Sequence, residues 1–205
     1  MSSMNSIRVV IVDDHEVVRS GLASLIQTWF PLRIVGQFAS GESLLNDPAI
    51  IAEADLVILD NLLQGISGEE TYLQLLDKGW KGVAIVLTVV ADNELHRNLL
   101  SKGVFRVIHK SDSTERLKQA IAEAVPALIS MKADVDSLIR RITPREMEFL
   151  RYICNDNEYT YDQIAHFMNV HVRTIDGFRK SLFQKLSIKS KTGLVMFAMR
   201  NGLNG

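Results

Sequence analysis

The chain of 205 residues has one cysteine, Cys154, and no long apolar segment. One cysteine excludes an internal disulfide, so nothing in the sequence requires an oxidising compartment. No apolar run approaches the ~18 residues that a membrane-spanning helix needs. The apolar run at 9–12 is too short for the core of a signal peptide. The sequence therefore predicts a cytoplasmic protein.

The composition has no strong bias either. Apolar residues make up 47% and charged residues 23%, which excludes a disordered tail, a collagen-like repeat and a coiled-coil rod. The length favours two compact units. The net charge of −1 is unevenly distributed along the chain. Residues 1–128 carry 11 Lys and Arg against 16 Asp and Glu, whereas residues 129–205 carry 12 Lys and Arg against 8 Asp and Glu. A basic second unit makes nucleic acid a candidate partner, with an ordinary solvated helix face as the alternative.

Short β-branched apolar runs recur at regular intervals in the first unit. They lie at 7–12, 34–38, 56–59, 83–87 and 104–108. Uninterrupted runs of this kind are typical of strands buried on both faces of a parallel sheet. The segments between and after them show helical spacing, at 18–29, 41–52, 68–78, 93–101 and 113–125. Five strands alternating with five helices predict a doubly wound α/β fold, whose ligands bind beyond the carboxyl ends of the strands.

Polar side chains follow four of these predicted strands. Asp13 and Asp14 follow the first strand, Asp60 the third, Thr88 the fourth and Lys110 the fifth. Each has an ordinary explanation alone, such as a helix cap, a strand end or an exposed cation. Because the carboxyl ends of parallel strands meet at one edge of a sheet, we expect all five to converge in one site.

This set of groups suits phosphoryl transfer to a carboxylate. Clustered carboxylates repel one another unless a cation lies among them, and Mg²⁺ prefers oxygen ligands. A carboxylate can act as the nucleophile and form an acyl phosphate, while an ammonium group and the metal neutralise charge. We therefore interpret Asp60 as the nucleophile and Asp13 and Asp14 as metal ligands. Lys110 would pair with the phosphoryl group, and Thr88 would respond to its arrival.

With these motifs the first unit resembles a receiver domain of the NarL/FixJ response regulators, over nearly all of residues 7–125. The resemblance rests on IVDDHEVVRSGL (11–22), VILDNLLQGISG (57–68), VLT (86–88) and VIHK (107–110). It implies a flavodoxin-like fold with strand order 2-1-3-4-5, and phosphorylation of Asp60 by a cytoplasmic sensor histidine kinase with Mg²⁺. It also implies that Asp14, Asp60 and the backbone carbonyl of Leu62 ligate the metal directly, while Asp13 acts mainly through water.

Three positions depart from the receiver pattern. Val107 stands where a Tyr or Phe is usual, Val89 where a small residue is usual, and Gln64 where a proline is common. None of these changes removes a reacting group, so we expect the phosphorylation chemistry to survive. Val89 is expected to crowd the phosphorylation pocket, and Val107 has no ring to change rotamer with Thr88.

Residues 126–141 are predicted to form a linker helix. Its apolar positions are spaced three and four apart, at Leu128, Met131, Val135, Leu138 and Ile142. This is shorter than a coiled coil requires. We expect the linker helix to pack on one domain, with self-association as the alternative.

The second unit is predicted to be all-helical. Thr143 with Glu146, and Thr160 with Gln163, are capping boxes that begin two helices. Asn169 marks a turn, because Asn tolerates a left-handed backbone. Further helices are expected over 172–186 and 191–200. Ala165, Asn169 and Ile175 have the offsets of a helix-turn-helix.

Residues 142–203 resemble the LuxR-type DNA-binding domain of the same regulators. The motifs are ITPREMEFL (142–150), YDQIAHFM (161–168), VRTIDGFRKSLFQKL (172–186) and GLVMFAMRNGL (193–203). The resemblance implies that Asp176, Gly177 and Lys180 face the bases. Residues implied to approach phosphates are Arg173, Thr174, Arg179 and Lys185. Asp176 stands where Lys or Arg is common, so it either accepts a hydrogen bond from cytosine N4 or weakens binding.

The sequence therefore predicts a two-component response regulator with a receiver at 1–125, a linker helix at 126–141 and a DNA-binding domain at 142–205. Phosphorylation of Asp60 would control dimerisation, DNA binding and transcription. Expected partners are double-stranded DNA, the kinase and a second copy, with RNA polymerase as a further candidate. The receiver would catalyse only its own phosphorylation and dephosphorylation. The alternatives are a phosphate-independent interaction module and a small phosphohydrolase using Asp60.

Overall fold

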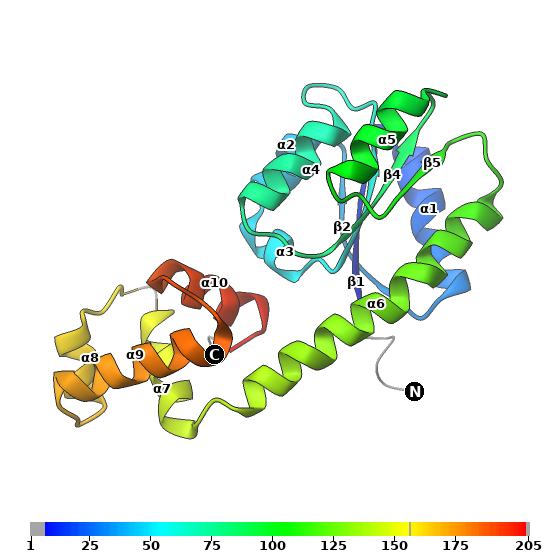
Figure 1. Ribbon diagram of the computed structural model, residues 1–205. Helices are drawn as coiled ribbons and strands as arrows, with labels where there is room; N and C mark the ends of the chain where they lie inside the picture. Colours follow the sequence, from blue (N-terminus) through cyan, green and yellow to red (C-terminus); the bar gives the residue numbers. More distant parts are fainter. Residues whose placement is uncertain (1–6, 156, 204–205) are drawn as a thin grey trace. The chain divides into compact units, whose positions relative to one another are not determined.

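The computed structural model describes residues 7–155 and 157–203. The chain divides into two compact units, Met1–Met131 and Lys132–Gly205. The first unit is an α/β layer structure and the second is helical (Figure 1).

The first unit is built on a parallel sheet of five strands. The strands are β1 (Arg8–Val12), β2 (Arg33–Phe38), β3 (Leu56–Asp60), β4 (Val83–Thr88) and β5 (Arg106–His109). Their order is β2-β1-β3-β4-β5, which confirms the predicted flavodoxin-like topology. β5 begins two residues later than expected. The Val104 N–H still donates to the Leu99 carbonyl of α5, while the Phe105 N–H donates to the Ala84 carbonyl of β4.

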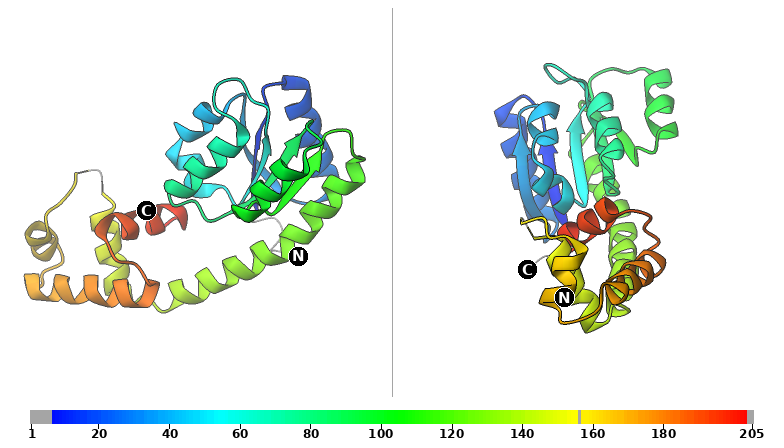
Figure 2. Two further views of the ribbon diagram at one scale, coloured as in Figure 1. Left: turned by 45° about the horizontal axis from the view of Figure 1, so that its top comes forward. Right: turned by 90° about the vertical axis from the view of Figure 1, so that its left-hand side faces the viewer.

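Helices cover both faces of this sheet, as two further views show (Figure 2). The helices are α1 (Glu16–Trp29), α2 (Gly41–Leu45), α3 (Pro48–Glu53), α4 (Gly68–Asp77), α5 (Asn93–Ser101) and α6 (Thr114–Arg140). Successive strand residues contact opposite layers, since Val9 and Ile11 pack with α1 and α6. Val10 and Val12 pack with α2 to α5. Burial on both faces explains why the strands lack a polar alternation.

The single helix expected over 41–52 is wrong, because this segment forms two helices. Asn46 ends α2, and the Asp47 side chain accepts a hydrogen bond from the Ile50 N–H to begin α3. Pro48 takes the first position of α3. A proline has no N–H and its ring clashes with the preceding turn, so it favours a new helix start over a helix interior.

The linker helix is not a separate element. α6 continues through Pro126 to Arg140, so it joins the helix expected over 113–125 to the one expected over 126–141. The expectation that the linker packs on one domain is also wrong. Leu128 lies in the core of the first unit, while Ile142 lies in the core of the second and Leu138 packs against that core.

The second unit contains α7 (Pro144–Ile153), α8 (Tyr161–Phe167), α9 (Val172–Leu186) and α10 (Lys191–Arg200). Both predicted capping boxes form, at Thr143 and Thr160. Asn169 has φ of 51°, as the turn between α8 and α9 requires. The predicted helices of this unit are therefore confirmed.

A membrane-spanning segment was not expected. Among the described residues, no helix combines the length and apolar character needed to cross a bilayer.

Candidate functional site

Three of the predicted site residues meet at the carboxyl edge of the sheet. The Lys110 amine lies 2.7 Å from Asp13 Oδ2 and 2.7 Å from Asp60 Oδ2. The strand register brings them together, since Val12 pairs with Leu59 immediately before the two aspartates. Asp13 is fully buried and Asp60 is 2% exposed. Two buried carboxylates this close are stable only with a compensating cation, which the amine supplies here.

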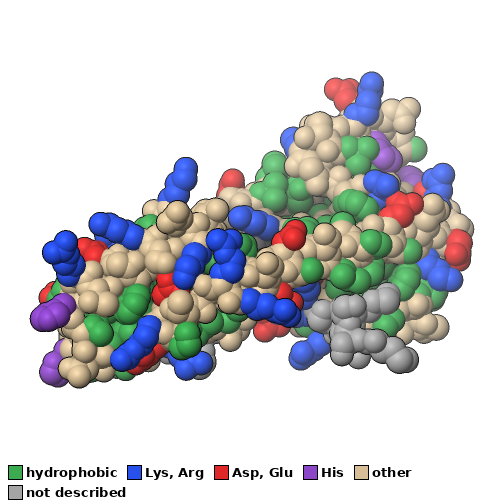
Figure 3. Space-filling view, turned by 60° about the horizontal axis from the view of Figure 1, so that its bottom comes forward, with side chains coloured by type: hydrophobic (Ala, Val, Ile, Leu, Met, Phe, Trp, Pro, Cys, Tyr) green, Lys and Arg blue, Asp and Glu red, His purple; other side chains and the backbone are tan. Residues whose placement is uncertain are grey.

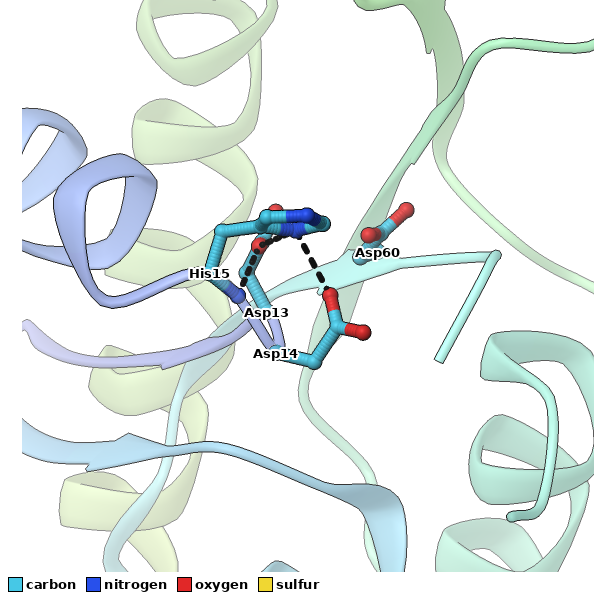
Figure 4. A group of neighbouring side chains, drawn as sticks. All are labelled: Asp13, Asp14, His15 and Asp60. Atoms are coloured by element: carbon cyan, nitrogen blue, oxygen red, sulfur yellow. Dashed lines mark hydrogen bonds and ion pairs between the residues drawn. The ribbon is translucent and has the colours of Figure 1, made fainter. Parts of the chain in front are cut away.

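Asp14 and His15 complete an acidic cluster at this edge (Figure 4). One ligand atom from each of Asp13, Asp14, His15 and Asp60 lies within 4.8 Å of the others. Asp14 Oδ1 is buried and accepts no hydrogen bond from the described residues. The His15 Nδ1 is 2.7 Å from this oxygen, as an ion pair if the ring is protonated. A buried oxygen that makes no hydrogen bond and has only the His15 ring nitrogen close by, beside two further carboxylates, fits a divalent cation with oxygen ligands.

Local structure fixes the position of Asp13. Its Oδ1 accepts a hydrogen bond from the His15 N–H at 2.9 Å, and its carbonyl oxygen accepts one from Arg19 at 2.6 Å. His15 itself provides no side-chain cap to α1. The sequence reasoning missed His15, although its place directly after the aspartate pair was a usable signal.

Asp60 is held from both sides. Its Oδ1 accepts a hydrogen bond from the Leu62 N–H at 3.1 Å, and its Oδ2 accepts one from Lys110. Burial raises the pKa of Asp60, and the Lys110 amine and Leu62 N–H offset only part of this effect. Burial opposes the charge of Lys110, but Asp13 and Asp60 outweigh it and raise the pKa of the amine, which stays protonated. A Cβ on Gly68 would lie 2.3 Å from the Asp60 carbonyl oxygen, so only glycine allows α4 to begin this close.

Thr88 lies at the same edge, but its hydroxyl is held by its own loop. Thr88 Oγ1 accepts a hydrogen bond from the Val90 N–H at 3.1 Å, and the Thr88 carbonyl accepts one from the Lys110 N–H at 2.6 Å. The Val89 side chain, which we expected to crowd the pocket, is 52% exposed. Val107 lies on the edge strand β5 and is buried, at 8% exposure.

The candidate DNA-binding residues lie on α9 in the second unit. Arg173, Thr174 and Lys180 are exposed. A Cβ built on the exposed Gly177 meets no atom within 4 Å, so this glycine does not pack against another helix. Figure 3 shows Lys and Arg side chains gathered on one face of the second unit.

Two cations assigned to phosphates are already paired within the protein. Arg179 lies 2.9 Å from Asp176, and its guanidinium stacks over the Tyr161 ring at 5.6 Å. Lys185 contacts both carboxylate oxygens of Glu146, at 2.9 and 2.7 Å.

Glu146 is the buried centre of a polar network between α7 and α9. It is 3% exposed and also accepts hydrogen bonds from the Ser181 hydroxyl and the Thr143 N–H and hydroxyl. Burial raises the pKa of this carboxyl, but Lys185, Ser181 and Thr143 outweigh burial and lower the pKa to about 2. The sequence predicted Glu146 as a helix cap and did not show its ion pair with Lys185.

Comparisons with known proteins match both units. Residues 9–122 match the response regulator receiver domain family, and residues 140–198 match the luxR family of bacterial regulatory proteins. The response regulator protein VraR of Staphylococcus saprophyticus is 28% identical over 210 residues, covering 96% of this chain and 98% of that protein. VraR of Staphylococcus aureus strain Mu3 is also 28% identical, covering 97% and 99%.

The solved structures similar to this chain include RcsB from Salmonella enterica serovar Typhimurium, bound to promoter rprA in the presence of phosphomimetic BeF3−. It has a TM-score of 0.53 and 22% identity, and the match covers 97% of this chain and all of that one. At this identity the likeness shows the fold.

Proposed function

Because the chain belongs to the response regulators, with a receiver and a LuxR-type DNA-binding domain, we propose that phosphorylation of Asp60 by a sensor histidine kinase controls dimerisation and DNA binding. The observation that carries this proposal is the Lys110 amine, 2.7 Å from the buried carboxylates of both Asp13 and Asp60. The proposed domain limits are 1–125 for the receiver, 126–141 for the linker and 142–205 for the DNA-binding domain.

In the proposed reaction, a carboxylate oxygen of Asp60 attacks phosphorus and forms an acyl phosphate, while the donor's bond to phosphorus breaks. Lys110 then pairs with the negative phosphoryl oxygens, because its ammonium group already lies at Asp60. The Thr88 hydroxyl donates a hydrogen bond to another of these oxygens. The same groups would serve hydrolysis of the acyl phosphate, and we propose no reaction on outside substrates.

The donor set fits Mg²⁺, with Asp13, Asp14, Asp60 and the backbone carbonyl of Leu62 as the groups that would hold it. Asp14 Oδ1 supports this assignment, since it is buried and accepts no hydrogen bond from the described residues, with the His15 Nδ1 beside it. When bound, the metal supplies charge neutralisation at the phosphoryl oxygens. Asp13 and Asp60 are oriented in advance by the His15 and Leu62 N–H groups.

On the DNA side, we propose that α9 enters the major groove with Asp176, Gly177 and Lys180 facing the bases. Arg173 and Thr174 would contact phosphates. Arg179 and Lys185 would contact phosphates only by exchanging or sharing their partners Asp176 and Glu146. The RcsB structure bound to promoter rprA supports double-stranded DNA as the partner. A promoter-binding role in the cytoplasm would also bring the protein close to RNA polymerase.

Labelling with acetyl phosphate, followed by mass mapping of the modified peptide, tests the receiver part of this proposal. The parent protein is expected to gain one base-labile phosphate on Asp60 only with Mg²⁺ present. Asp60→Asn nearly preserves the shape and removes the nucleophile, so it should gain none. Asp77→Asn changes an exposed aspartate at the end of α4 and should label like the parent. Equal labelling of the Asp60→Asn protein at this site contradicts the mechanism.

A further inference from the structure

His109 lies at the end of β5, directly before Lys110, and none of the roles proposed above uses its side chain. Its Nε2 lies 2.7 Å from the carbonyl oxygen of Val89. Its Nδ1 lies 2.6 Å from the Ser111 hydroxyl oxygen and 3.2 Å from the Ser111 backbone nitrogen. The ring therefore links the segment after β5 to the loop after β4.

The partners of the ring determine its tautomer. A carbonyl oxygen only accepts hydrogen bonds, so Nε2 carries a hydrogen and donates it to Val89. A backbone N–H only donates, so Nδ1 accepts the hydrogen bond from Ser111 with its lone pair. We assign the neutral tautomer with hydrogen on Nε2 from this network. Both ring nitrogens are then satisfied in one orientation of the ring.

His109 is placed opposite Thr88, the residue expected to respond to phosphorylation. The two are register partners where β4 pairs with β5. The loop that follows, residues 88–90, receives two hydrogen bonds from the dipeptide 109–110: the Lys110 N–H donates to the Thr88 carbonyl, and His109 donates to the Val89 carbonyl. Val89 and Val90 are 52% and 41% exposed, so packing restrains these two residues of the loop little.

The same dipeptide reaches the acceptor carboxylate, because Lys110 contacts Asp60. A phosphoryl group on Asp60 would bring charged oxygens that attract the Thr88 hydroxyl through a strong hydrogen bond. A shift of Thr88 toward these oxygens displaces the next peptide, whose carbonyl group His109 holds. Phosphorylation and the His109–Val89 hydrogen bond therefore compete for the position of one loop.

We propose that His109 is a positioning residue for the response to phosphorylation. Its ring holds loop 88–90 in the unphosphorylated arrangement, and the hydrogen bond to Val89 breaks when Thr88 moves. The contact provides a two-state element at the β4–β5 edge, where Val107 has no aromatic ring to provide one. The inference rests on the proposed function, because the movement of Thr88 depends on phosphate at Asp60.

The test measures hydrogen exchange of the Val90 amide by NMR in the full-length protein, before and after acetyl phosphate with Mg²⁺. His109→Leu removes the ring donor, and His109→Gln retains an N–H donor. His96→Leu is the matched control, since His96 is an exposed histidine on α5. The Val90 N–H donates to Thr88 Oγ1, so its exchange reports whether loop 88–90 keeps its arrangement. Loss of the His109–Val89 hydrogen bond is expected to raise the exchange rate of this amide on the order of five- to tenfold.

We expect phosphorylation to accelerate Val90 exchange in the parent, His109→Gln and His96→Leu proteins. His109→Leu should exchange rapidly before phosphorylation and change less than about twofold afterwards. A parent-like rate in unphosphorylated His109→Leu overturns the inference. The labelled fraction of Asp60 in the same sample separates two failures. An unlabelled Asp60 contradicts the proposed function, whereas a labelled Asp60 with an unchanged Val90 rate in the parent contradicts the role of His109.

Discussion

At the residue scale, the receiver site depends on one amine shared by two buried carboxylates. Lys110 is 21% exposed in its side chain, and its partners Asp13 and Asp60 are 1% and 2% exposed. In such a setting the amine stabilises both carboxylates, and removing it would leave two buried carboxylates that repel each other.

Gly177 allows a test of the DNA-binding face that separates stability from binding. Gly177→Ala is expected to raise the free energy of unfolding of the second unit by up to about 1 kcal/mol, because glycine disfavours helix and the site has open space. Gly177→Leu should likewise keep or raise stability, yet weaken binding of selected DNA by at least about tenfold if the backbone approaches the bases closely. Urea unfolding and DNA titration measure the two effects. Parent-like DNA affinity of Gly177→Leu would show that this face does not enter the groove.

Sequence reasoning identified the residue types of the site better than their pairings. Asp13, Asp60 and Lys110 could be predicted because each ends a buried strand, and parallel strands end at one edge. The pairs Asp176–Arg179 and Glu146–Lys185 could not be assigned this way. A cation near a helix surface looks the same in sequence whether it faces DNA or a carboxylate of another helix.

At the element scale, Glu146 connects the start of α7 to the last turns of α9. Its carboxylate accepts from Thr143 on one side and from Ser181 and Lys185 on the other. Because α9 carries the proposed base contacts, this network sets the position of that helix against α7 in the same unit. A buried, fully bonded carboxylate of this kind favours one arrangement of the two helices.

The lowered pKa of Glu146 predicts a specific dependence of stability on pH. Its pKa falls from 4.5 to about 2 on folding, so its contribution is present above pH 4.5 and is lost as the pH falls toward 2. Urea unfolding of the second unit should therefore show the parent losing on the order of 2 kcal/mol more than Glu146→Gln over this range. Glu148→Gln, on the more exposed side of the same helix, should keep the parent's dependence. Identical pH profiles for parent and Glu146→Gln would contradict the network.

Strands and capped helices were the most predictable elements. The buried strands carry uninterrupted β-branched runs, and the capping boxes at Thr143 and Thr160 are local signals that need no tertiary information. The two wrong expectations, a single helix over 41–52 and a separate linker helix, both involve a proline. Whether a proline ends a helix depends on the packing around it. Pro48 begins a new helix at α3, whereas Pro126 lies inside α6, where packing of Leu128 and its neighbours against the sheet continues the helix.

At the scale of the whole molecule, the receiver and the DNA-binding domain are joined by α6. Leu128 of this helix lies in the core of the first unit, and Leu138 packs against the core of the second. The charge division of the sequence follows the same boundary: the acidic unit carries Asp60, the proposed phosphorylation site, and the basic unit carries α9.

Dimerisation is expected to respond only modestly to phosphorylation. Val107 lacks the aromatic ring that could change between exposed and buried positions, and one hydrogen bond such as that of His109 carries a small free energy. We therefore expect phosphorylation to change the dimer dissociation constant by less than about tenfold, measured by analytical ultracentrifugation. A much larger change that disappears in Thr88→Ala would show that a stronger two-state element exists in the receiver.

The most direct test of the account is the affinity of the full-length protein for DNA selected from a random pool, with and without phosphorylation. The affinities are measured by fluorescence anisotropy at one fixed salt concentration. The parent treated with acetyl phosphate should bind the DNA at least about fivefold more tightly than the untreated parent, because fivefold is the lower end of typical coupling between two sites. Asp60→Asn should bind with one affinity under both conditions. An equal gain in Asp60→Asn, or no gain in a parent protein with Asp60 labelled, would contradict the claim that phosphate on Asp60 controls DNA binding.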